Sequence, residues 1–83
     1  MGSAVDWKEI KYKETFESEF RGLSRRKASD PALKVEDIEG ILKNMYILYG
    51  ADQDKGEVQE ILLSATIAAY ESFISAWKAE NLN

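Results

Sequence analysis

The chain contains a single proline, Pro31, which lies between two long segments with helical periodicity. Proline lacks a backbone N–H and disfavours the helical conformation of the preceding residue, so we expect the first helix to end before Asp30. A second break follows, where Gly50 is expected to end a helix in the left-handed conformation and Asp54 to cap the next one. The two breaks predict three helices, over residues 7–28, 35–49 and 55–80.

Each of the first two predicted helices carries one apolar face, as expected of helices packed on a common core. The face of the first helix consists of Tyr12, Phe16, Phe20 and Leu23. Trp7 and Ile10 lie off this face, so they either fold back as an N-terminal clamp or make a second contact. The face of the second helix consists of Ile38, Ile41, Leu42, Met45, Leu48 and Tyr49, whereas Gly40 and Ile47 lie away from it.

The third predicted helix is apolar around most of its circumference. Its two apolar rows together cover roughly 260°, against the 100° or somewhat more that a surface helix needs. At 1.5 Å per residue its length is roughly 39 Å, whereas the second helix is roughly 22 Å long. The part of the third helix that extends past its partner in the hairpin contains Ile74 and Trp77. Such an apolar overhang is typical of a protein contact.

We therefore expect an all-α fold, a small three-helix bundle in which the second and third helices form an antiparallel hairpin beside the first. The third helix is expected to pair with its counterpart in a homodimer. The expected interface consists of Leu63, Ala65, Ile67, Ala69, Tyr70, Ile74 and Trp77. The alternative is a monomeric bundle in which the first helix covers the second apolar row.

Length and composition narrow the function. Eighty-three residues support one domain, expected over 7–80, with residues 1–6 a disordered N-terminus or cloning remnant and 81–83 a flexible C-terminus. The chain has no histidine and no cysteine, which excludes thiol and histidine catalysis and the usual structural zinc sites. A net charge of -4 disfavours general binding to nucleic acid or to an anionic membrane. Without a signal or membrane-spanning pattern, the expected location is the cytoplasm.

Acidic residues at the predicted helix starts are the candidates for a metal site. Asp52, Asp54 and Gly56 have the wrong register for a calcium loop, which requires glycine at position 6 and glutamate at position 12. The pairs Glu36/Glu39 and Glu57/Glu60 have helical spacing, but a di-iron bundle would add histidines. We expect these carboxylates to stabilise helix starts, and we expect neither metal nor cofactor.

A basic cluster near the end of the first helix is the candidate site for an anion or an acidic partner. It consists of Arg21, Arg25, Arg26 and Lys27. Clustered guanidinium groups bind oxyanions in a bidentate manner. Ser29, three residues after Arg26, also fits a basophilic kinase site, and a solvated helix end is the simplest interpretation of the cluster.

The sequence therefore favours a protein that acts by self-association and by contact with another protein, without catalysis. One alternative is an effector-binding bundle that encloses an apolar molecule near Gly40 and Ile47 or between two third helices. A weaker alternative is a nucleic-acid-binding regulator that uses the basic cluster.

Overall fold

The computed structural model describes residues 6–51 and 56–81 and confirms the all-α prediction. The helices are α1 (Asp6–Ser29), α2 (Val35–Ala51) and α3 (Glu57–Asn81). Asp6 and Asn81 are thus helical, although both were expected to lie outside the domain. Residues 1–5, 82 and 83, the rest of the expected termini, lie outside the described residues.

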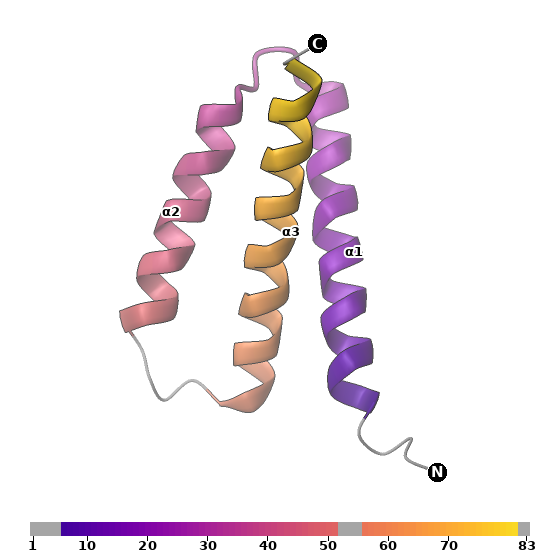
Figure 1. Ribbon diagram of the computed structural model, residues 1–83, viewed down its shortest axis with the longest axis vertical. Coiled ribbons are helices and arrows are strands. Elements are labelled where there is room, and N and C mark those ends of the chain that lie inside the picture. The colour runs from indigo at the N-terminus through magenta and orange to yellow at the C-terminus, as the bar shows by residue number, and fades with distance from the viewer. Residues whose placement is uncertain (1–5, 52–55, 82–83) are drawn as a thin grey trace.

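The three helices lie side by side with α3 in the middle (Figure 1). The chain runs up α1, down α2 and up α3, so α2 and α3 form the expected antiparallel hairpin and α1 runs parallel to α3. Contacts between α1 and α3 are more extensive than those between α2 and α3. The last helix in the sequence therefore forms the centre of the bundle.

The connection between α1 and α2 follows the prediction made from Pro31. Helix α1 ends at Ser29, and the Asp30 side chain accepts a hydrogen bond of 3.1 Å from the backbone N–H of Ala32. At the start of α2, the Asp37 carboxylate accepts a hydrogen bond of 3.0 Å from the backbone N–H of Lys34. This bond satisfies one of the donors that a helix start leaves without an intrahelical partner.

The predicted end of α2 at Gly50 is wrong. Helix α2 continues through Gly50 to Ala51, and no described glycine has a positive φ. A glycine inside a helix costs about 1 kcal/mol relative to alanine, which packing elsewhere can offset. The expected cap at Asp54 lies outside the described residues.

The buried core lies toward the end of the bundle that carries the α1–α2 connection. It consists of Leu23, Leu33, Ile38, Leu42, Ile67, Phe73 and Ile74. Ile38 is fully buried, at 0% exposure. Toward the other end α2 diverges from α3, as Figure 1 shows. We call this second end, which comprises the start of α1, the end of α2 and the start of α3, the open end.

Polar side chains link the helices across the surface. Lys8 pairs with Glu57 at the open end of α1 and α3, and Lys27 pairs with Glu80 at 3.1 Å near their other ends. Lys78 of α3 pairs with Glu39 of α2 at 2.6 Å. Exposed ion pairs of this kind contribute about 0–1 kcal/mol each, so they fix the relative placement of the helices more than they stabilise the fold.

Tyr46 of α2 donates a hydrogen bond to the Glu71 carboxylate of α3. This hydrogen bond, followed by desolvation and the negative charge of Glu71, raises the pKa of Tyr46 above its ordinary value of 10.0. Since the folded state holds the phenol proton more tightly than the unfolded chain, the link stabilises the fold below this ordinary pKa. This contribution to stability is lost as the pH rises through the raised pKa of Tyr46.

Candidate functional site

The residues expected to form a dimer interface on α3 are buried or partly buried within the single chain. Ala65, Ile67, Ala69 and Ile74 are buried. Leu63, Tyr70 and Trp77 are partly buried and pack against the same core. Because α1 and α2 lie on either side of α3, two helices of one chain cover much of the wide apolar arc. The breadth of that arc therefore does not by itself require a second chain.

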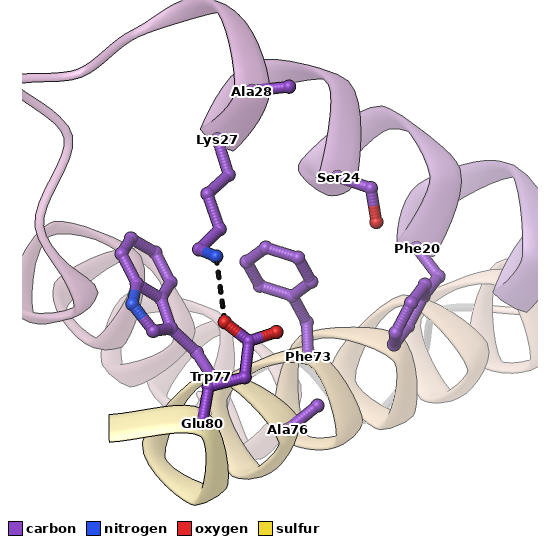
Figure 2. A pocket seen from close by; sticks show the side chains of 8 residues that line it. All are labelled: Phe20, Ser24, Lys27, Ala28, Phe73, Ala76, Trp77 and Glu80. Carbon is purple, nitrogen blue, oxygen red and sulfur yellow. Dashed lines mark hydrogen bonds and ion pairs between the residues drawn. The ribbon is translucent and has the colours of Figure 1, made fainter. Parts of the chain in front are cut away.

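The end of α3 packs against α1, as in the monomeric alternative. The Trp77 ring contacts the Phe73 ring edge to face, with ring centroids 5.8 Å apart and planes at 76°. The Lys27 ammonium lies 5.0 Å from the centroid of the Trp77 ring and pairs with Glu80. Figure 2 shows Lys27 reaching from α1 to the Glu80 carboxylate beside the indole ring. Trp77, which was predicted to extend past its partner helix, is thus covered in part by α1.

A cavity of about 320 Å³ lies beside these residues, between α1 and α3 (Figure 2). Its aromatic lining includes Phe20 and Phe73, whose rings meet edge to face at 5.5 Å, together with Trp77. On the α1 side the lining includes Ser24 and Ala28. We call this space the end cavity; its lining is mixed, with the aromatic rings on one side and polar groups that include Lys27 and Glu80.

Two shallower hollows extend the end cavity along α1 toward the open end. The first, of about 390 Å³, shares Phe20 and Ser24 with the end cavity and is also lined by Arg21. The second, of about 330 Å³, continues past Glu17 to Tyr12. Each of the three spaces shares lining residues with the next, and we call the row of them along α1 the groove.

One row of side chains on α1 is exposed along the whole helix. Its members are spaced alternately three and four residues apart, which places them on one face. We call them the outer row: Trp7, Ile10, Glu14, Glu17, Arg21, Ser24 and Ala28. Trp7 is 45% exposed and Ile10 is 54% exposed, although both belong to the helix. Because both residues lie within α1 and point away from the core, they do not fold back as an N-terminal clamp.

The structure distributes the basic cluster around α1 instead of gathering it into one patch. Arg25, Arg26 and Lys27 are consecutive and therefore point about 100° apart. Lys27 is directed to Glu80 and Trp77, whereas Arg26 lies close enough to Tyr70 to influence its titration. Burial, followed by the charge of Glu19, raises the pKa of Tyr70, and the positive charge of Arg26 partly opposes this rise. Arg21 belongs to the outer row and lines the groove.

The other candidate sites are placed as follows. The space beside Gly40 is open, because a Cβ added there would meet no atom within 4 Å, and Ile47 is 60% exposed.

Within residues 6–51 and 56–81, no group of three or more acidic side chains is arranged to hold a metal ion. No helix in this part of the chain is long and apolar enough to cross a membrane. Asp52 and Asp54 of the rejected calcium loop fall outside the described residues.

Sequence reasoning missed the outer row because it sought the apolar face of each helix. Trp7, Ile10 and Ala28 were the available signal, since all three fall on the a and d positions of one heptad frame.

Comparison with known protein families, with curated proteins and with solved structures finds no match for this chain.

Proposed function

We propose that this protein acts by self-association as a homodimer and through contact with other proteins, without catalysing a reaction. The proposal keeps the mode of action inferred from the sequence but assigns it to a different surface. The observation that carries it is the distribution of exposed apolar side chains.

The large apolar side chains that are exposed among the described residues all lie at the open end. They are Trp7, Ile10 and Tyr12 on α1, Tyr46, Ile47, Leu48 and Tyr49 on α2, and Val58 on α3. Scattered exposed apolar residues are normal, but a concentration of them at one end of a small domain is typical of a protein contact. Covering the exposed half of the Ile10 side chain would contribute roughly 1 kcal/mol.

The end cavity supports a second candidate function, the binding of a small apolar molecule. Its volume falls at the lower limit of about 300 Å³ for ligand pockets, and three aromatic rings line it. This location differs from those expected from the sequence, near Gly40 and Ile47 or between two third helices. A bound small molecule in native mass spectrometry of the protein from its host would support this candidate.

The molecular mass in solution tests the proposed function. Equilibrium sedimentation at micromolar protein concentration is expected to give a mass of twice 9.4 kDa, with dissociation on dilution. A mass of 9.4 kDa at every concentration would contradict the proposal.

A further inference from the structure

We infer that the dimer partner binds along the outer row of α1, and that this partner is a second copy of the chain whose α1 runs antiparallel. This inference rests on the proposed function and names the surface that performs it. It is supported by the exposure of the row, by its charge order and by the position of the end cavity.

The outer row is accessible from end to end. All seven of its side chains are exposed, whereas Leu23 on another face of the same helix is buried against α3. At 1.5 Å per residue, the 24 residues of α1 span about 36 Å. A second helix therefore has access to an uninterrupted face of this length.

The charges along the row are complementary to those of a second copy in the antiparallel direction. The acidic members, Glu14 and Glu17, come before the one basic member, Arg21. A parallel copy would place equal charges opposite one another, whereas an antiparallel copy can place Glu17 opposite Arg21. Two-fold symmetry then forms each contact twice.

Pairing of Glu17 with Arg21 of the second copy determines the register. In this register Glu14 lies opposite Ser24, and Ile10 lies opposite Ala28 of the other chain. Both Ser24 and Ala28 line the end cavity, so Ile10 reaches the mouth of a space whose lining includes three aromatic rings. The exposed side chain of Ile10 is thereby covered by the far end of the other α1.

The same arrangement gives one member of the basic cluster, Arg21, a role in dimerisation. Arg21 contacts an acidic partner, as the sequence suggested, and the partner is the Glu17 carboxylate of another copy. Lys27 does not take part, because it pairs with Glu80 and packs on Trp77 within its own chain.

Charge reversal tests the register. Glu17→Arg alone and Arg21→Glu alone each bring like charges together in both copies, so each is expected to weaken the dimer roughly tenfold. The double variant Glu17→Arg/Arg21→Glu has the composition and net charge of the wild type and retains opposite charges four residues apart in the helix. It is expected to restore dimerisation, as measured by sedimentation at low salt.

The outcomes distinguish the two levels of the proposal. A dimer that both single variants leave unchanged, or that the double variant does not restore, would overturn the α1 pairing while the proposed function stands. A wild-type protein that is monomeric would overturn both. Helix content measured by circular dichroism shows whether each variant remains folded.

Discussion

Replacement of Phe73 by alanine is expected to lower the free energy of unfolding by about 3–5 kcal/mol, which is the usual cost of removing a buried aromatic ring. Phe73 is buried and links the rings of Phe20 on α1 and Trp77 on α3. Its removal would therefore open the core where α1 and α3 join. Folded domains are stable by about 5–15 kcal/mol in total, so the variant is expected to lose a large part of its stability and to unfold at a lower denaturant concentration.

Chemical denaturation followed by circular dichroism measures this effect. Val58→Ala provides a control on the same helix, because Val58 is 46% exposed and its truncation leaves the core intact. The control is expected to shift the free energy of unfolding by less than about 1 kcal/mol. Equal losses in the two variants would show that Phe73 does not join the helices as described.

The variant Ile10→Asp is expected to weaken the dimer by about a hundredfold while leaving the fold intact. Ile10 is more than half exposed in the single chain, so an aspartate there is solvated in the monomer. In the proposed dimer the same position faces Ala28 and the end cavity of the second copy. Each of two symmetric sites then loses about 1 kcal/mol of apolar burial and places a carboxylate in the contact, and about 3 kcal/mol in total corresponds to the stated change in Kd.

Ile47→Asp is the matched control for this loss. Ile47 belongs to the same exposed apolar set and is exposed to a similar degree, but it lies on α2, which the antiparallel pairing of α1 leaves outside the dimer interface. Sedimentation of both variants is expected to show a dissociated Ile10→Asp protein and an intact Ile47→Asp dimer. Dissociation caused only by Ile47→Asp would place the interface on α2 instead.

The sequence predicted those parts of the fold that depend on local chemistry. Pro31 marks the end of α1 because its ring and missing N–H act on adjacent residues. Leu23 of α1 and Ile38 and Leu42 of α2 were identified as core residues because helical periodicity alone places each of them on the apolar face of its own helix. In contrast, Gly50 was misread as a terminator, since glycine weakens a helix by an amount that packing elsewhere can offset.

The candidate site depended on tertiary arrangement and was therefore less accessible from the sequence. The sequence indicated that α3 is apolar around most of its circumference, but it did not show that α1 and α2 lie on either side of α3. Without this placement Ile67 and Ile74 were assigned to an interface, although the single chain buries them. The sequence placed Trp7 and Ile10 off the apolar face of the first helix. Their exposure became evident only when the structure showed which face of α1 packs against α3.

Disulfide formation between two single-cysteine variants tests the antiparallel pairing of α1 most directly. The natural chain has no cysteine, so Ile10→Cys and Ala28→Cys each carry one thiol. Along one helix the two positions lie about 27 Å apart, well beyond the ~7 Å limit for Cα atoms joined by a disulfide. Identical residues are similarly far apart in the proposed pair, so neither variant is expected to link to itself.

Oxidation of an equimolar mixture of Ile10→Cys and Ala28→Cys is expected to give a disulfide-linked heterodimer, detected by mass spectrometry, whereas each variant oxidised alone stays unlinked. A mixture of Ile10→Cys with Ile47→Cys at the same concentration sets the level of linking by random collision. Heterodimer formation above that level only in the Ala28→Cys mixture is the predicted result. Linking at the collision level in both mixtures, or faster linking of one variant with itself, would contradict the pairing.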